Sequence, residues 1–313
     1  MLQLRRLVFA LAGSLALATP ALAGKLAIVI DDFGYRPSTE NQVLAMPAEV
    51  SVAVLPNAPH AREMATKAHN QGHDVLIHLP MAPLSKQPLE KDTLRPDMSS
   101  DEIARIIREA VNDVPYAIGM NNHMGSAMTS SLPGMQKVMA ALAHYNLFFL
   151  DSMTIGNSQA MRAAAGTGVK VIKRKVFLDD TQNEADIRYQ FNRAVALARR
   201  NGSAIAIGHP HPSTVRVLQQ MLYSLPPDIR LVRASSLLNE PQVDTSRPNA
   251  APPSQTVPAA PRNPFRGVKL CKPKRQPEPV YATRFFTVIS ESVSESAVVS
   301  YFRHQWQGWG KQS

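Results

Sequence analysis

The stretch KLAIVIDDFG, residues 25–34, decides the fold of this chain. Its run of aliphatic residues up to Ile30 is typical of a strand buried on both faces, as in a parallel sheet. Asp31 and Asp32 close the run, and Gly34 allows a tight turn directly after them. The stretch therefore predicts a central strand whose carboxyl end directs two carboxylates into a pocket.

Short apolar runs alternate with helical patterns along residues 25–238, and turn or capping residues separate them. The predicted strands are 25–31, 50–55, 74–79, 116–122, 147–151, 169–178, 203–208 and 229–234, and the clearest predicted helices are 99–111, 132–144, 183–200 and 213–224. Seven or eight strands that alternate with helices in one domain predict a parallel sheet closed into a barrel. An open, doubly wound sheet is the competing architecture, and in both folds ligands bind at the carboxyl ends of the strands.

The amino terminus has the pattern of a secretory signal peptide. Arg5 and Arg6 precede the apolar stretch 7–18, and small residues around Ala23 form a cleavage site. A retained membrane anchor is the alternative, since the stretch is slightly short for a span of about 20 residues. We expect residues 1–23 to be removed on export and the mature protein to be periplasmic.

The charge of the chain is concentrated outside the predicted domain, which spans residues 24–240. The 313 residues contain 34 Lys and Arg against 24 Asp and Glu, and residues 241–313 contribute ten of these basic and four of these acidic side chains. Because an exported protein meets anionic lipid or cell-wall polymer, this charge does not indicate nucleic acid as a partner. Cys271 is the one cysteine, which excludes an intramolecular disulfide.

Two segments follow the predicted domain. Residues 241–280 are rich in proline and basic side chains, which predicts an extended linker. Residues 281–313 regain apolar spacing, which predicts an amphipathic helix, with a strand through 297–302 as the alternative. The aromatic end around Trp306 favours docking on the core, on an envelope protein or on a membrane surface. The basic composition is equally consistent with a solvated tail.

Three side chains at strand ends form a candidate metal site. Asp32, His78 and His123 each lie where an apolar run ends, so a parallel sheet would bring one carboxylate and two imidazoles to the same edge. A catalytic site with three protein ligands keeps one coordination position open for water. Each residue alone also fits a structural role, as a turn cap or a hydrogen-bonded histidine. The set predicts a divalent metal, with zinc as the first choice and nickel, cobalt or manganese as alternatives.

Five motifs follow one another along residues 25–238. They are LAIVIDDFG (26–34), HLPM (78–81), NHMGS (122–126), FLDS (149–152) and GHPH (208–211). Together they resemble the divergent polysaccharide deacetylase family, and most closely its YibQ-type members. That family is similar to the NodB-type carbohydrate esterases, which implies a distorted (β/α) barrel of seven strands and the removal of acetyl groups from N-acetylated sugars.

The resemblance also implies roles for the residues at the first strand ends. Asp31 corresponds to the general base, Asp32 to a metal ligand and His78 to the first metal-binding histidine. The second histidine of the NodB-type motif would stand at Ala82, so His123, from the next strand, is the candidate replacement. The NodB-type arginine and proline motif near this strand is also absent.

The remaining predicted roles concern proton transfer and substrate binding. His209 matches the family histidine that protonates the leaving amine, and Asp151 is predicted to orient His209 and keep it cationic. A backbone N–H of Gly125 or of Ser126 would stabilise a developing oxyanion. His211 also fits a structural role between two prolines. The predicted substrate-binding set is Asn122, Gly125, Ser126 and His211.

These features favour an exported, metal-dependent hydrolase that removes N- or O-acetyl groups from a carbohydrate, with an acetylated glycan or cell-wall polymer as substrate. The alternative belongs to another class: a catalytically inactive protein with the deacetylase fold that binds glycan or an envelope protein as a scaffold. Ala82 and the missing arginine motif motivate this alternative, as does the basic tail.

Overall fold

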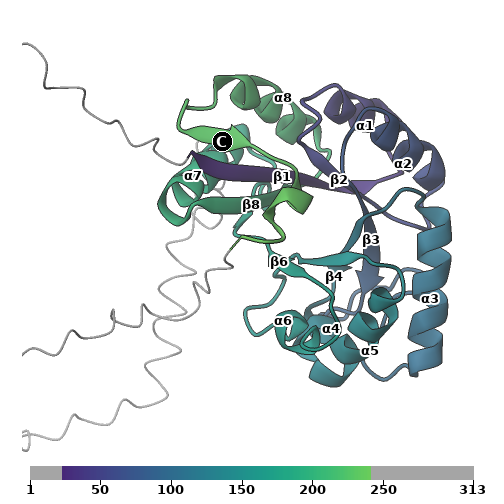
Figure 1. The fold of residues 1–313 in the computed structure, drawn as a ribbon. Coiled ribbons are helices and arrows are strands. Elements are labelled where there is room, and N and C mark those ends of the chain that lie inside the picture. The colour runs from purple at the N-terminus through teal and green to yellow at the C-terminus, as the bar shows by residue number, and fades with distance from the viewer. Residues whose placement is uncertain (1–22, 241–313) are drawn as a thin grey trace, which may run out of the picture. The chain divides into compact units, whose positions relative to one another are not determined.

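The computed structural model describes residues 23–240, which form one curled parallel sheet covered by helices (Figure 1). The strands are β1 (Gly24–Phe33), β2 (Ser51–Val54), β3 (Val75–Met81), β4 (Gly119–Met124), β5 (Phe148–Asp151), β6 (Val171–Lys173), β7 (Val176–Phe177), β8 (Ser203–Gly208) and β9 (Ile229–Leu231). The α-helices are α1 (Pro37–Leu44), α2 (Ala61–Asn70), α3 (Ser100–Asp113), α4 (Ser126–Ser130), α5 (Leu132–Ala143), α6 (Ala160–Ala163), α7 (Glu184–Asn201) and α8 (Pro212–Met221), with 3₁₀ turns η1 (Leu222–Ser224) and η2 (Ala234–Leu237). The predicted signal peptide, linker and amphipathic segment lie outside the described residues, apart from Ala23.

The order of strands shows that the sheet curls back on itself. The order is β6-β5-β4-β3-β2-β1-β8-β7, with β9 paired to the start of β1, and every ladder is parallel. The two edge strands β6 and β7 are separated in sequence only by Arg174 and Lys175. Their facing ends, Lys173 and Val176, therefore lie at most about 11 Å apart. The distorted barrel is confirmed, and an open doubly wound sheet is excluded.

The predicted strand 169–178 was wrong, because the structure divides it into two strands, and this division explains how the barrel closes. The sequence predicts a single strand over 169–178, whereas the structure divides it into two. Its first half pairs with β5 on one edge, and its second half pairs with β8 on the other. The segment thus crosses the gap between the edges, and no single ladder continues through it.

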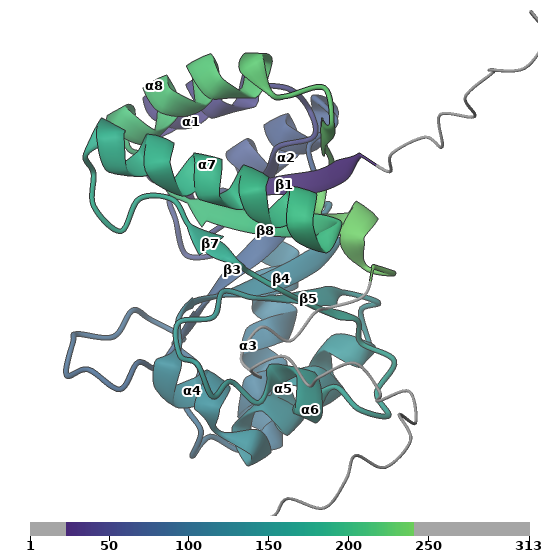
Figure 2. The same cartoon turned by 90° about the vertical axis from the view of Figure 1, so that its left-hand side faces the viewer.

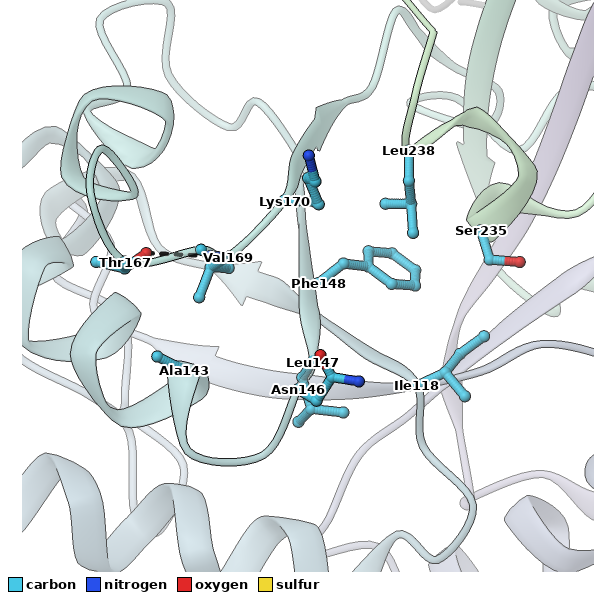
Figure 3. A pocket seen from close by; sticks show the side chains of 11 residues that line it. Ile118, Ala143, Asn146, Leu147, Phe148, Thr167, Val169, Lys170, Ser235 and Leu238 are labelled. Carbon is cyan, nitrogen blue, oxygen red and sulfur yellow. Dashed lines mark hydrogen bonds between the residues drawn. The ribbon is translucent and has the colours of Figure 1, made fainter.

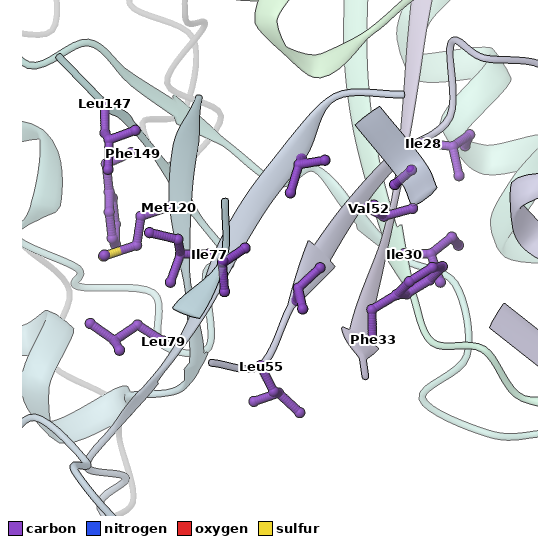
Figure 4. Packing of buried hydrophobic residues seen from close by; sticks show 14 of the residues in the cluster. Ile28, Ile30, Phe33, Val52, Leu55, Ile77, Leu79, Met120, Leu147 and Phe149 are labelled. Atoms are coloured by element: carbon purple, nitrogen blue, oxygen red, sulfur yellow. The ribbon is translucent and has the colours of Figure 1, made fainter. Parts of the chain in front are cut away.

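Two apolar layers hold the sheet. The outer layer packs β1 residues such as Ile28 and Ile30 against the surrounding helices (Figure 4). The inner layer contains Ala27 and Val29 from the same strand, because successive strand residues point to opposite faces. Figure 2 shows α7 and α8 over β1 and β8, and α3, α4, α5 and α6 around the other half of the sheet.

Capping residues fix the helices that the sequence predicts. Ser99 accepts a hydrogen bond from the backbone N–H of Glu102 at the start of α3, and Asn183 accepts one from Ala185 at the start of α7. Helix α7 ends at Gly202, whose φ of 80° suits glycine. Within residues 23–240 no helix has both the length and the apolar character needed to cross a membrane.

A cavity of about 320 Å³ lies near the amino-terminal ends of β4, β5 and β6 (Figure 3). Ile118 and Leu147, which precede β4 and β5, line it together with Lys170, Ser235 and Leu238. The polar residues of the sequence motifs stand at the opposite ends of the strands, so this cavity is separate from the candidate site.

Candidate metal centre

The polar motif residues meet at the carboxyl ends of neighbouring strands. In the parallel ladders Pro80 pairs with His123, and Ile30 pairs with Gly208, the residue before His209. Side-chain alternation places Asp31 and His78 on the inner face of the sheet, because they follow Val29 and Leu76 by two residues and both of these belong to the inner layer. Polar side chains therefore close the barrel interior at the carboxyl ends of the strands.

A bulge at the end of β1 brings both acids to the polar carboxyl end of the barrel interior. The register with β2 pairs Ile30 with Val52 but Phe33 with Val54, so β1 has one residue more than β2. Asp32 is that irregular point, with a φ of 58°. In an unbroken strand two consecutive side chains would point to opposite faces. The bulge lets Asp31 and Asp32 both serve one site.

Asp32, His78 and His123 converge, as the sequence predicts. Asp32 Oδ1 lies 3.3 Å from His78 Nε2 and 3.2 Å from His123 Nδ1, and the two nitrogens are 3.0 Å apart. Ligands about 2.0–2.1 Å from one tetrahedral zinc ion are separated from one another by about 3.3 Å. The three donor atoms thus have the spacing that a single divalent ion requires.

Oδ1 of Asp32 supplies an independent reason to place a cation here. This oxygen is buried, and its nearest polar neighbours are the two imidazole nitrogens 3.2 and 3.3 Å away, neither of which is aligned well enough to count as a hydrogen-bond donor. Burial alone would raise the pKa of Asp32, but the imidazoles of His123 and His78 outweigh burial and hold that pKa well below its usual range. A buried, ionised oxygen without a well-aligned donor is costly unless a positive charge, on an imidazolium or on a metal ion, lies beside it. The residues present therefore fit a metal.

The charges on β1 favour positive charge at His78. Burial would lower the pKa of His78, but Asp31 and Asp32 outweigh it and raise that pKa. Oδ2 of Asp31 lies 3.7 Å from Nε2 of His78. The pKa of Asp31 is itself raised, chiefly because the side chain is buried. The same field that would stabilise an imidazolium would stabilise a bound divalent ion.

Two further side chains hold the histidines and were not predicted. Asn121 accepts a hydrogen bond from Nδ1 of His78 at 2.8 Å, which leaves Nε2 facing Asp32. Glu90, in the loop after β3, lies 3.4 Å from Nε2 of His123, so Nδ1 of that ring faces the site. Metal-binding histidines usually have such a partner on their second nitrogen.

His209 has a different partner from the one that the sequence suggested. The residue that orients it is Asp179: Oδ1 lies 3.0 Å from Nδ1 of His209, and Oδ2 accepts from the His209 backbone N–H and from Thr214 Oγ1, both at 2.7 Å. Burial would lower the pKa of His209, but Asp179 outweighs it and the pKa rises to about 9. Nε2 of His209 lies 3.8 Å from Oδ2 of Asp32. His209 therefore carries a proton at neutral pH and faces the candidate centre.

The prediction that Asp151 orients His209 was wrong for a geometric reason. Asp151 follows Phe149 by two residues, and Phe149 belongs to the outer layer, so Asp151 points away from the inner face. It is buried and accepts a hydrogen bond from the backbone N–H of Met153 at 2.9 Å. A sequence signal for Asp179 exists, because VFLDD (176–180) repeats the pattern of an apolar run that closes in two acids.

Asp179, His209 and His211 also lie close enough together to hold a metal. Both oxygens of Asp179 are already engaged by His209 and Thr214, which accounts for this carboxylate without an ion. We therefore assign Asp179 to the support of His209.

Comparison with known proteins now identifies the family. The model of the divergent polysaccharide deacetylases matches residues 28–238. The chain belongs to the divergent polysaccharide deacetylase family. This chain is 78% identical over 312 residues to the uncharacterised protein YibQ of Escherichia coli, and the match covers 100% of this chain and 97% of YibQ.

Two more distant similarities are also found. The chain is 47% identical over 224 residues to an uncharacterised protein of Haemophilus influenzae, which covers 72% of this chain and 80% of the relative. Among solved structures, an uncharacterised protein from Agrobacterium tumefaciens is similar, with a TM-score of 0.64 and 20% identity over 70% of this chain and 91% of that one. The latter likeness shows a shared fold.

The predicted substrate-binding residues of this deacetylase-family protein lie on β4, at the start of α4 and directly before α8, and their roles stay predictions. Asn122 uses its amide within the protein, since it accepts from Ser152 N and donates to Met124 O. Ser126 Oγ accepts from the backbone N–H of Leu84. Gly125 has a φ of 96°, and His211 precedes α8 at its N-cap position.

Arg174 is a further residue that the sequence analysis missed. It donates from Nε to Ser152 O at 2.5 Å and from a terminal nitrogen to Met153 O at 2.8 Å, and it stands 4.9 Å from the centre of the Phe177 ring. Burial lowers the pKa of Arg174, opposed first by the charge of Asp31. Arg174 therefore acts on Asp31 through its charge alone, since no hydrogen bond joins the two side chains among the described residues.

Proposed function

We propose that this protein is an exported, metal-dependent hydrolase that removes acetyl groups from a glycan of the cell envelope. The observation that carries the proposal is the convergence of Asp32, His78 and His123, whose ligand atoms lie 3.0–3.3 Å from one another around a buried carboxylate oxygen without a well-aligned hydrogen-bond donor. Zinc is the ion that we expect, because one carboxylate and two imidazoles at this spacing suit it.

The residues of the chain divide the chemistry between them. A bound divalent ion would act as a Lewis acid and lower the pKa of water. Asp31 would accept a proton at a carboxylate oxygen from the attacking water. His209 would deliver its Nε2 proton to the leaving nitrogen or oxygen, while Asp179 holds Nδ1 on the other side of the ring. The acid and the base thus face the same centre from β8 and β1.

The choice of substrate and compartment rests on the family and on the amino terminus. Family membership supports an acetylated carbohydrate as substrate. Residues 1–23 support export, and an exported deacetylase meets cell-wall glycans.

Metal analysis tests the proposal directly. Purified protein is dialysed against zinc, and bound metal and acetate release from acetylated chito-oligosaccharides are measured for the wild type and for Asp32→Ala, His78→Ala and His123→Ala. We expect about one ion per chain in the wild type and losses of both metal and acetate release in the variants. His60→Ala is the matched control, since His60 also contacts a carboxylate, that of Glu63 at 2.9 Å, but lies outside the site. Equal, negligible metal in all proteins would refute the site.

A second candidate is a catalytically inactive protein that binds glycan as a scaffold. The burial of Asp31 favours it, because a side chain that is 4% exposed has restricted access to attacking water. Zinc binding without acetate release, together with glycan binding that survives Asp31→Asn, would support the scaffold.

A further inference from the structure

The carboxamide of Asn121 lies between Asp31 and His78 in the barrel interior. Its Nδ2 donates to Oδ1 of Asp31 at 2.8 Å, and its Oδ1 accepts from Nδ1 of His78 at 2.8 Å. A longer contact of 3.4 Å joins Nδ2 to Oγ of Ser152. Asn121 is fully buried, so protein groups rather than bulk water satisfy its amide.

Donor and acceptor chemistry determines which way round this amide lies. An ionised carboxylate can only accept a hydrogen bond, so Asp31 requires the NH₂ end of Asn121. The carbonyl end then faces His78 and requires a proton on Nδ1. Nε2 of His78 is consequently the ring atom that faces Asp32 Oδ1 at 3.3 Å and His123 Nδ1 at 3.0 Å.

We propose that Asn121 is a positioning residue that links the base to the metal site. One amide selects the ring nitrogen with which His78 binds the ion, and the same amide holds Asp31 in place. This inference rests on the proposed metal-dependent function. Loss of the group that supports a metal-binding histidine typically lowers metal affinity about 10–100-fold, so the role of Asn121 is measurable without any assay of turnover.

Two substitutions separate the two hydrogen bonds. Asn121→Asp keeps an oxygen for Nδ1 of His78 but removes the donor to Asp31, whereas Asn121→Leu removes both at similar volume. Zn²⁺ affinity is measured by competition with a chromogenic chelator. We expect Asn121→Asp to bind Zn²⁺ at least as tightly as the wild type, and Asn121→Leu to bind it about 10–100-fold more weakly.

The adjacent residue provides a matched control. Asn122 is also buried on β4, but its amide bonds only to Ser152 N and Met124 O among the described residues. Asn122→Leu therefore tests whether any loss of a buried amide on this strand weakens Zn²⁺ binding. An equal loss of affinity in Asn122→Leu and Asn121→Leu would overturn the proposal.

A reciprocal exchange tests the bond to Asp31. Asn121→Asp alone places two carboxylates together and should lower the melting temperature. The double variant Asp31→Asn, Asn121→Asp restores one donor and one acceptor and should recover most of that loss. No recovery in the double variant would contradict the assignment, and this test remains available if Asn121→Leu does not fold.

The tautomer of His78 distinguishes failure of this inference from failure of the proposed function. In metal-free protein labelled with ¹⁵N-histidine, at a pH at which the His78 ring is neutral, NMR should show a protonated, hydrogen-bonded Nδ1 in the wild type and in Asn121→Asp, but not in Asn121→Leu. If the wild type bound no Zn²⁺, the proposed metal site would be wrong. The NMR measurement would still test the hydrogen bond between Asn121 and His78, because it uses metal-free protein. An unchanged Nδ1–H signal in Asn121→Leu would refute the role of Asn121.

Discussion

The support of His209 by Asp179 makes a quantitative prediction about Thr214. This side chain is fully buried, and its hydroxyl donates to Oδ2 of Asp179 at 2.7 Å. Thr129 is equally buried, but its hydroxyl donates to the neutral backbone carbonyl of Gly125 at 2.8 Å. Replacement of each threonine by valine keeps the shape and removes one hydrogen bond, so the pair compares a charged acceptor with a neutral one.

The expected costs differ because of the charge. A net contribution of about 1.5–3 kcal/mol is typical for a hydrogen bond to a charged group, against about 0.5–1.5 kcal/mol for a neutral one. The apolar gain of the new methyl group is the same in both variants and cancels in the comparison. We expect Thr214→Val to lower the free energy of unfolding by about 1 kcal/mol more than Thr129→Val.

Urea denaturation followed by circular dichroism measures this difference, and thermal melting provides a check. A cost of 1 kcal/mol corresponds to about 2–4 °C for a domain of this size, so Thr214→Val should melt about 2–4 °C below Thr129→Val. Thr214→Ser keeps the hydroxyl and should therefore retain most of the stability that the hydrogen bond to the Asp179 carboxylate contributes. Equal losses of stability in the two valine variants would refute the claim that Thr214 donates a hydrogen bond to an ionised Asp179.

The remaining predictions concern the metal and the packing around it. Zinc at 100 times its dissociation constant should stabilise the wild type by about 2.7 kcal/mol in a thermal melt, whereas Asp32→Ala should show no zinc-dependent shift; a shift in both would place the ion elsewhere. Glu90→Gln should weaken zinc binding about tenfold by chelator competition, and unchanged affinity would remove Glu90 from the support of His123. Asp179→Asn should lower the rate of acetate release about 10²–10⁴-fold, as loss of the carboxylate that orients a catalytic histidine does in other enzymes. Asp151→Asn should leave that rate nearly unchanged. A large loss in Asp151→Asn and none in Asp179→Asn would restore Asp151 as the residue that orients His209. Gly119→Ala should cost about 1–3 kcal/mol in urea denaturation, because its Cβ would lie 2.6 Å from the ring of Phe148, and a stable variant would mean that this ring can move.

The candidate ligands could be predicted from the sequence because parallel strands share an edge. Asp32, His78 and His123 each end an apolar run, and the fold class alone then requires their side chains to meet. The support of these ligands could not be predicted in the same way. Glu90 lies in a loop, and no periodic pattern states where a loop side chain will point. Asn121 directly precedes the motif NHMGS, but its partners depend on the pairing of β4 with β3.

The sequence by itself determined the alternation of strands and helices, the buried character of β1 and the strand ends at which chemistry is possible. These are local properties, since hydrophobic periodicity and capping residues act within a few positions of one another. Tertiary structure alone decided that residues 171–177 bridge both edges of the sheet and that Asp179, not Asp151, supports His209. It also decided that a bulge turns Asp32 toward the same centre as Asp31. The physical reason is that the face to which a side chain points depends on strand register and on closure of the barrel, and both are set by contacts between residues far apart in the chain.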